Sequence, residues 1–232
     1  MRPALLERRS ALPIVAWGMN NEDHKIWLQG KMQTCYVAGE GRNMLQHSQR
    51  HYSEDDYFAV EASSGIKHEF YQGEIFAMAG ASLAHNHLSA NVLTLLRGTV
   101  RQKGCSAFGS DLRVKTPDGL FTYPDVMVIC GPISLTQDRP DTVTNPCVVV
   151  EVLSDATRDY DRGEKFTLYK AIPTLAEYLL IEQGRVCIEH WQRQPLGDWT
   201  AQTYTTLDAV ISLPTLGITL PLREVYLEVF DS

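Results

Sequence analysis

The chain has 232 residues, a formal net charge of −7 and 44% hydrophobic residues. This length is typical of one domain, and this composition excludes fibrous proteins and chains that are disordered throughout. The acidic balance, with a pI near 5.5, argues against a protein that wraps DNA or anionic lipid by general attraction. The sequence contains no run of 18 apolar residues and opens without a secretory signal, so we expect a cytoplasmic protein.

The first 50 residues differ from the rest of the chain. They contain seven Lys/Arg and four Asp/Glu, and they show no sustained apolar period. We therefore expect residues 1–50 to be a poorly ordered extension and residues 51–232 to form a single domain. Two origins of the extension stay open: a genuine flexible arm, or sequence upstream of a start at Met44.

Five cysteines occur, at positions 35, 105, 130, 147 and 187. Their number is odd and no CxxC pair is present, so neither a disulfide framework nor a zinc ribbon is expected. Cys130 and Cys147 lie in or beside apolar runs, which predicts small buried side chains.

The predicted elements alternate between helices and strands. Ser53 and Ser82 are typical N-cap residues, and Gln72-Gly73 separates two β-prone runs as a hairpin turn does. The run 147–153 is almost entirely apolar and β-branched, which is typical of a central strand covered on both faces. In chain order we expect a helix over 53–62, a hairpin over 67–78, a helix over 83–103, strands over 105–108, 112–116 and 122–130, a polar loop over 131–145, a strand over 147–153, a helix over 159–171, strands over 177–182, 185–191 and 200–205, and a last helix over 222–229. This order predicts an α/β fold with a mixed sheet.

Two carboxylates interrupt apolar strands. Asp125 heads a Val/Ile-rich run, and Glu151 lies in the middle of 147–153, where it shares a strand face with Val149 and Leu153. An ionised carboxylate in such surroundings costs several kcal/mol unless a positive group or hydrogen-bond donors compensate it. A divalent cation on oxygen ligands would compensate both carboxylates, and a salt bridge or a strand-end hydrogen bond would compensate either one.

A lysine follows on the next predicted helix. Asp161, Lys165 and Tyr169 are spaced at i, i+4 and i+8, so they line one face of that helix. Lys165 can extend past the end of the central strand toward the carboxylates, where an ammonium group would orient a water or stabilise charge on a phosphate. A solvated helix face with i,i+4 ion pairs would show the same spacing.

Two histidines and one more carboxylate are further candidates for a functional role. His85 and His87 lie two residues apart on a predicted helix, about 200° apart around its axis, so they cannot share a metal ion. His85 falls near the apolar stripe and is the candidate for an inward-facing polar role. Glu69, in the predicted hairpin, is a candidate outer carboxylate. A purely structural role is the competing interpretation for each.

Six stretches, taken together, resemble the PD-(D/E)XK nuclease superfamily. Within it the chain resembles a bacterial family of predicted restriction endonucleases, abundant in cyanobacteria and long catalogued as a domain of unknown function. The stretches keep their order over roughly residues 52–195, and they are His68–Ser82, His85-Asn86, Ser110–Val114, Tyr123–Val128, Val150–Ser154 and Tyr160–Phe166.

The resemblance implies a restriction-endonuclease-like fold, with a central mixed β-sheet flanked by α-helices. It implies Asp125 and Glu151 as catalytic residues and Mg²⁺ ligands, with the backbone carbonyl of Val152 as a further ligand. Its supporting residues are Glu69, His85, Asp111 and Asp161.

One departure from the superfamily pattern bears on catalysis. The superfamily motif has a lysine two residues after the second acid, and this position is Leu153 here. In the resembled family the lysine is relocated to the following helix, which matches Lys165. Catalysis therefore depends on whether Lys165 reaches the carboxylates.

The activity that the resemblance implies is Mg²⁺-dependent hydrolysis of phosphodiester bonds in DNA, with Mn²⁺ as a substitute metal. An acidic domain must meet DNA through a local groove, and a homodimer would suit double-strand cutting. The basic residues that could line such a groove are Arg97, Arg101, Lys103, Arg113 and Lys115. Two alternatives stay open: a catalytically silent nucleic-acid-binding or assembly module on the same fold, and metal-dependent hydrolysis of another phosphoester.

Overall fold

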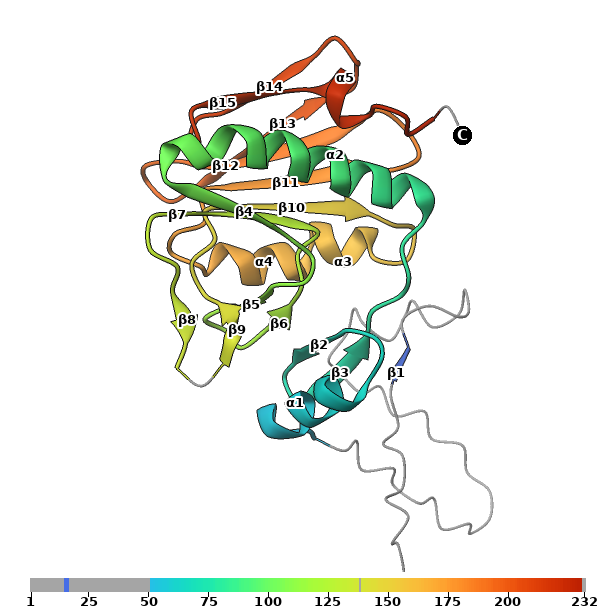
Figure 1. The fold of residues 1–232 in the computed structure, drawn as a ribbon, viewed down its shortest axis with the longest axis vertical. Coiled ribbons are helices and arrows are strands. Elements are labelled where there is room, and N and C mark those ends of the chain that lie inside the picture. Colours follow the sequence, from blue (N-terminus) through green and yellow to red (C-terminus); the bar gives the residue numbers. More distant parts are fainter. Residues whose placement is uncertain (1–14, 17–50, 138, 231–232) are drawn as a thin grey trace, which may run out of the picture.

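A six-stranded mixed sheet forms the centre of the molecule (Figure 1). The structure is a computed structural model that describes residues 15–16, 51–137 and 139–230. In spatial order the strands are β13 (Trp199–Tyr204), β12 (Ile188–Arg193), β11 (Glu177–Glu182), β10 (Val148–Leu153), β7 (Val126–Cys130) and β4 (Cys105–Gly109). β10 pairs parallel with β11 and antiparallel with β7.

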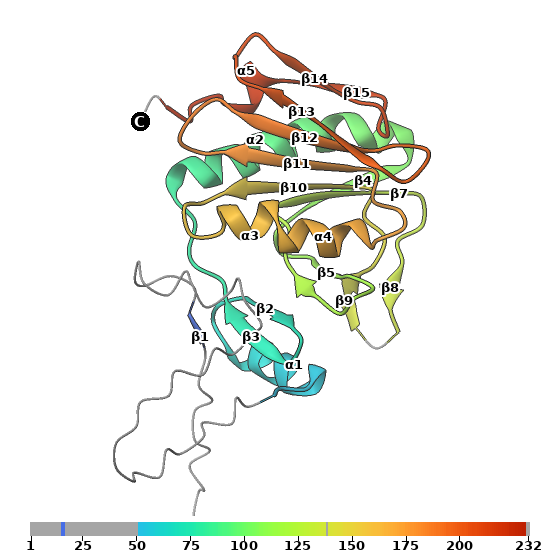
Figure 2. The same cartoon turned by 180° about the vertical axis from the view of Figure 1, so that it is seen from behind.

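Helices cover both faces of this central sheet. α2 (Leu83–Val100) lies on one face, and α3 (Arg158–Arg162) and α4 (Glu164–Lys170) lie on the other, as the view from behind shows (Figure 2). The predicted α/β fold, a central mixed sheet flanked by helices, is confirmed. No helix in the described part of the chain is long and apolar enough to cross a bilayer.

The alternation of side chains along β10 decides what each helix covers. Val150 belongs to the buried cluster that contains Leu88 of α2, whereas Val149 belongs to the cluster that contains Phe166 of α4. Successive side chains on a strand point to opposite faces, so Glu151 lies on the face covered by α4.

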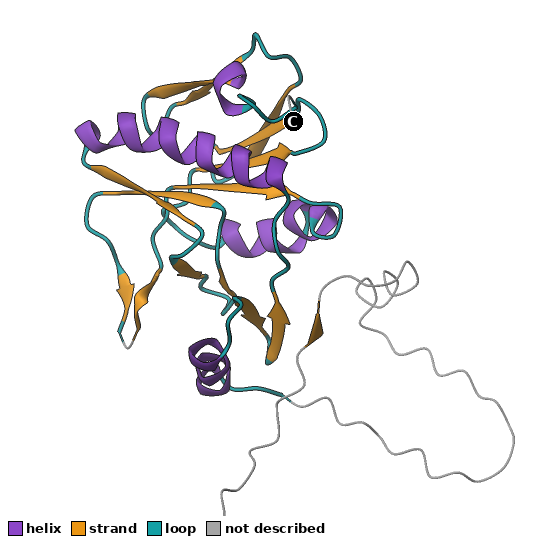
Figure 3. Ribbon diagram, turned by 45° about the vertical axis from the view of Figure 1, so that its right-hand side comes forward, coloured by secondary structure: helices purple, strands orange, loops and turns teal. Residues whose placement is uncertain are grey.

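A second sheet, of seven short strands, lies beside the first and is covered by α1 (Glu54–Ser63) (Figure 3). Its strands are, in spatial order, β1 (Val15–Ala16), β3 (Glu74–Ala77), β2 (His68–Tyr71), β6 (Phe121–Thr122), β5 (Arg113–Lys115), β9 (Arg139–Val143) and β8 (Leu135–Thr136). Gln72 and Gly73 both have positive φ, as a type I′ turn requires, and the predicted hairpin is confirmed. Apart from β1, residues 1–50 lie outside the described residues, so the predicted extension and the Met44 start stay predictions.

The prediction of a single strand over 122–130 is wrong. The segment is two strands, β6 and β7, and these belong to different sheets. Pro124 lacks an N–H group and cannot continue a ladder, so the chain leaves one sheet before it and enters the other after it. Asp125 therefore stands at the junction between the two sheets.

Three other segments differ from the prediction. The segment predicted as a polar loop over 131–145 contains the hairpin β8–β9. The helix predicted over 159–171 is split into α3 and α4 at Gly163, whose backbone angles are not helical (φ −103°, ψ −96°). The loop after β13 contains the hairpin of β14 (Val210–Leu213) and β15 (Ile218–Pro221), which precedes the short α5 (Leu222–Val225).

The cysteine prediction needs a correction. Cys105 and Cys130 form a disulfide between directly opposed positions of β4 and β7. Cys147 is buried as predicted, and its Sγ lies 3.6 Å from Cys130 Sγ. The spacing of cysteines along the chain carries no information on strand register, and register is what brings Cys105 and Cys130 together.

We expect the disulfide to contribute about 3 kcal/mol to the free energy of unfolding, because it closes a loop between residues 25 positions apart. The double variant Cys105→Ser/Cys130→Ser should lose this amount in urea unfolding, and its midpoint should not respond to dithiothreitol. Cys187→Ser, which removes a free buried thiol, is the control that keeps the response to reductant. A wild-type midpoint that is unaffected by reductant would contradict the assignment.

Candidate active site

Four carboxylates and one lysine converge where β10 ends and β7 begins. Glu69 comes from β2, Asp125 from the junction between the sheets, Glu151 from β10, Asp161 from α3 and Lys165 from α4. Their side chains are only 5% to 16% exposed. The arrangement carries four potential negative charges around one ammonium group, inside a protein interior.

Lys165 is the centre of this cluster. Its Nζ lies 3.0 Å from Glu69 Oε1, 3.0 Å from Glu151 Oε1 and 3.4 Å from Asp161 Oδ1. Burial lowers the pKa of Lys165, but the charges of Glu151 and Glu69 outweigh burial and raise this pKa well above its ordinary value. Lys165 therefore remains an ammonium ion at neutral pH, and it reaches the carboxylates from the helix that follows β10.

Glu151 is held from two sides. The Tyr169 hydroxyl donates to its Oε1 at 2.8 Å, and the backbone N–H of Asp125 donates to its Oε2 at 3.3 Å. Burial first, and then the charges of Asp125 and Asp161, raise the pKa of Glu151 to about 8 despite the neighbouring Lys165 ammonium. A single ammonium group thus does not compensate the negative charge gathered here.

Asp125 is positioned by α2 and by β10. Its Oδ1 lies 2.9 Å from His85 Nε2, and its Oδ2 accepts a 2.7 Å hydrogen bond from the backbone N–H of Val152. Burial lowers the pKa of His85, but the hydrogen bond and the charge of Asp125 raise it by more, so the net shift is upward. The N–H and C=O of one strand residue point to the same side, so the Val152 carbonyl also faces the side of Asp125.

The hydroxyl groups of Tyr169 and Thr122 complete the cluster, and the sequence pattern indicates only Tyr169. Tyr169 was placed on the correct helix face by its spacing, although its bond to Glu151 was not predicted. Thr122 Oγ1 donates to Glu69 Oε1 at 2.5 Å, and nothing in the sequence pattern marks Thr122. It is an ordinary strand residue until the fold brings β6 beside β2.

Asp111 is not part of this cluster. Its side chain is 95% exposed and forms an ion pair with Lys67 at 2.6 Å. The other expected supporting residues, Glu69, His85 and Asp161, do meet Asp125, Glu151 and Lys165.

The donor atoms fit a hard divalent cation. Across the described residues, no three His, Cys, Asp or Glu side chains form a ready-made metal group. Mg²⁺ does not require one, because it commonly binds one or two carboxylates and keeps several waters. Both oxygens of Asp125 and the Oε2 of Glu151 each accept one of the hydrogen bonds described, and a carboxylate oxygen can accept two. Together with the Val152 carbonyl, these atoms are suitable oxygen ligands.

Comparison with known proteins agrees with this geometry. The family model Uma2, described as "Putative restriction endonuclease", matches residues 54–223. The chain belongs to the Uma2 family. The family expected from the sequence is thereby confirmed.

Proteins similar to the chain occur in Synechocystis and in Anabaena variabilis. Two uncharacterised proteins of Synechocystis are similar to the chain: slr1290 is 36% identical over 177 residues, which is 75% of this chain and 90% of that protein, and sll1609 is 39% identical over 145 residues, which is 62% and 82%. The crystal structure of a "putative nuclease belonging to DUF820" from Anabaena variabilis superposes with a TM-score of 0.60 at 16% identity, covering 72% of this chain and 93% of the other. That likeness shows the fold.

Lys165→Met should reduce the free energy of unfolding of this Uma2 protein by about 3 kcal/mol, because it removes the cation from a buried group of carboxylates. Urea unfolding at pH 7 without divalent cations measures the loss. Lys170→Met is a matched control on the same helix, since Lys170 lies over the Phe166 ring and this contact is worth about 1 kcal/mol or less. Equal losses from the two variants would argue against the central place of Lys165.

Proposed function

We propose that the chain is a Mg²⁺-dependent endonuclease that hydrolyses phosphodiester bonds in DNA. The observation that carries the proposal is the undercompensated carboxylate pair of Asp125 and Glu151, linked through the Asp125 N–H, with Lys165 3.0 Å from Glu151. The family description and the nuclease-like fold support the general activity. To this general activity the proposal adds the metal ion, the role of the relocated lysine and the DNA substrate.

Each residue has a role that follows from its contacts. Asp125, Glu151 and the Val152 carbonyl would hold the cation, and His85 and Tyr169 keep the two carboxylates in place. When bound, Mg²⁺ supplies positive charge that polarises a phosphate and lowers the pKa of a coordinated water. Lys165 would donate a hydrogen bond to the attacking water or to the charge that develops on the phosphate. Glu69 and Asp161 hold the Lys165 ammonium in position.

Asp125→Asn should reduce cleavage of supercoiled plasmid DNA in Mg²⁺ or Mn²⁺ by at least ~100-fold, because the amide lacks the charge that holds a cation. Lys165→Ala should reduce cleavage by a similar factor. Asp111→Asn is the matched control, since it is the same substitution at an exposed acid outside the cluster. Cleavage that persists in both Asp125→Asn and Lys165→Ala would remove the site assignment.

One observation favours a second candidate, a catalytically silent nucleic-acid-binding or assembly module. Glu151 Oε1 already receives both the Lys165 ammonium and the Tyr169 hydroxyl, so this oxygen is satisfied without a metal ion. The homodimer suggested by double-strand cutting fits either candidate and stays a prediction.

Titration calorimetry with Mn²⁺ separates the two candidates. We expect heat of binding in the wild-type protein, and we expect this heat to disappear in Glu151→Gln, which removes the charge but keeps the shape of the side chain. Glu164→Gln, an equivalent change at a partly exposed acid of α4, should leave the heat unchanged. A wild-type protein without heat of binding and without cleavage would favour the silent module.

A further inference from the structure

Three of the basic residues expected to help hold DNA are engaged elsewhere. Arg113 is buried. Lys115 forms an ion pair with Glu54, and Lys103 donates to the Gly217 carbonyl. Burial or contacts within the fold therefore hold these three side chains in place.

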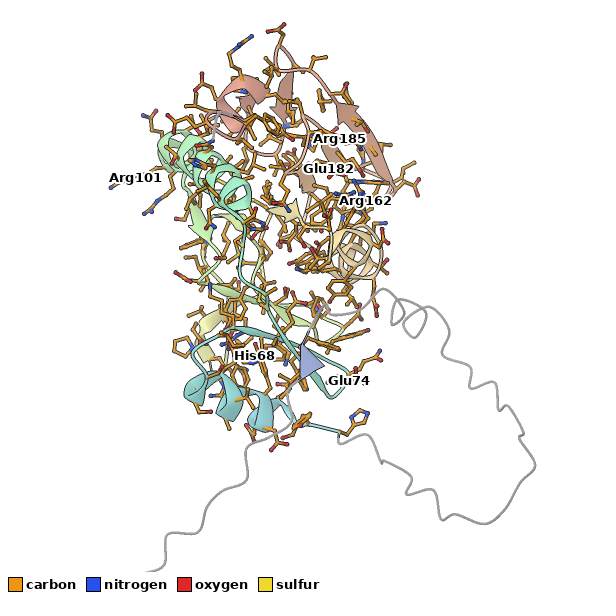
Figure 4. All side chains as sticks on the ribbon, turned by 90° about the vertical axis from the view of Figure 1, so that its right-hand side faces the viewer. His68, Glu74, Arg101, Arg162, Glu182 and Arg185 are labelled. Atoms are coloured by element: carbon orange, nitrogen blue, oxygen red, sulfur yellow. A yellow bond between two sulfur atoms is a disulfide. The ribbon has the colours of Figure 1, made fainter. Side chains whose placement is uncertain are left out.

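The other two, Arg97 and Arg101, lie at the end of α2 that is far from the candidate active site. His85 is near the start of this helix, and a rise of 1.5 Å per residue puts Arg101 about 24 Å further along its axis. Figure 4 shows Arg101 well away from the labelled arginines on the other side of the sheet. An acidic chain that contacts DNA must then draw on other cations close to the carboxylates.

Such cations gather at the end of β11. Arg158 and Arg162 of α3 and Arg185 of the following loop surround the buried carboxylate of Glu182, at 3.0, 2.7 and 3.9 Å. Figure 4 labels Arg162, Arg185 and Glu182. We call Arg158, Arg162 and Arg185 the arginine cluster. Its three guanidinium groups share the buried carboxylate of Glu182, and Arg158 and Arg162 each have a second, more exposed carboxylate partner.

Two members of the arginine cluster keep hydrogen-bonding capacity. Arg185 is 70% exposed and lies at the edge of ion-pair distance from Glu182. Arg158 is 37% exposed, and one nitrogen, Nη2, makes both of its ion pairs; its second ion partner, Asp155, is almost fully exposed, so solvent screens that pair strongly. Arg162 differs, because Glu182 and Glu189 both hold its guanidinium group.

The arginine cluster lies at the same sheet edge as the candidate active site. Glu151 pairs in register with Leu180, and Glu182 is two residues further along β11. Strand spacing and rise per residue then put the Glu151 and Glu182 Cα atoms roughly 8 Å apart. The start of α2 reaches this edge as well, through the contact of Ser82 with Gln183, and its first turn contains no acid. A helix start without acids favours an anion.

We infer that the guanidinium groups of Arg158 and Arg185 bind backbone phosphates of the DNA strand whose scissile bond lies at Asp125 and Glu151. This inference rests on the proposed nuclease function. Arginine suits the task because its planar group forms paired hydrogen bonds with a phosphate. Phosphates on one strand repeat every 3.4 Å along the helix axis, so a phosphate about two nucleotides from the cleaved bond comes within reach. Arg162 keeps Glu182 neutralised while the other two side chains face the strand.

DNA binding without cleavage tests the inference. The full chain is titrated into a fluorescein-labelled 20-base-pair duplex in EDTA, and fluorescence anisotropy gives the Kd at several salt concentrations. Arg158→Ala/Arg185→Ala should weaken binding by at least ~10-fold and should make the slope of log Kd against log salt shallower by about 2, one unit for each lost phosphate contact. Arg158→Lys/Arg185→Lys should recover part of the affinity, because the charge returns without the paired geometry.

The control is Arg97→Ala/Arg101→Ala, which removes the same charge at the far end of α2 and should change the Kd by less than ~2-fold. Thermal unfolding checks the fold, which should persist because Arg162 remains 2.7 Å from Glu182. Equal weakening by the two alanine pairs, or an unchanged salt slope, would overturn the inference, while cleavage in Mg²⁺ would still support the nuclease. A wild-type protein that neither binds nor cleaves the duplex would overturn both.

Discussion

The structure depends on one buried electrostatic arrangement, in which a single ammonium group meets several carboxylates. Lys165 contacts Glu69, Glu151 and Asp161, and Asp125 adds its charge from the junction between the sheets. Groups of this kind are stable in an interior only when their charges are closely matched. Here they are not, and burial together with the charges of Asp125 and Asp161 raises the pKa of Glu151. A cation on Asp125 and Glu151 would resolve the mismatch, which is why the same atoms are the best candidates for chemistry.

Two breaks in regular structure make this arrangement geometrically possible. Pro124 ends one ladder and lets the next residue, Asp125, turn its side chain toward the end of β10, where Val152 donates to it. Gly163 interrupts the helical segment after β10, yet Asp161, Lys165 and Tyr169 all still face Glu151 or its partners. The irregular positions thus lie beside the polar cluster, and the regular strands and helices around them provide the apolar support.

Much of this could be predicted from the sequence, because period and residue type carry the relevant information. The alternation around Glu151 indicated its strand face, and the i, i+4 spacing indicated the helix face of Lys165. The errors have two sources. Pro124 marks the break in 122–130 locally, but the sheet that each half joins depends on long-range pairing. The Cys105–Cys130 disulfide and the contact of Thr122 with Glu69 also arise from strand pairing, which local patterns do not encode. The sequence pattern did not indicate the arginine cluster either, because its members become neighbours only around Glu182.

The junction at Asp125 has a consequence for how the protein acquires its chemistry. Glu69 belongs to the seven-stranded sheet, Glu151 belongs to the central one, and Asp125 stands on the short connection that joins them. The central sheet, the connection and α4 supply Glu151, Asp125 and Lys165, and the other sheet adds the carboxylate that holds the Lys165 ammonium. For a molecule that would cut nucleic acid, this ties the final placement of its ammonium group to the docking of the two sheets.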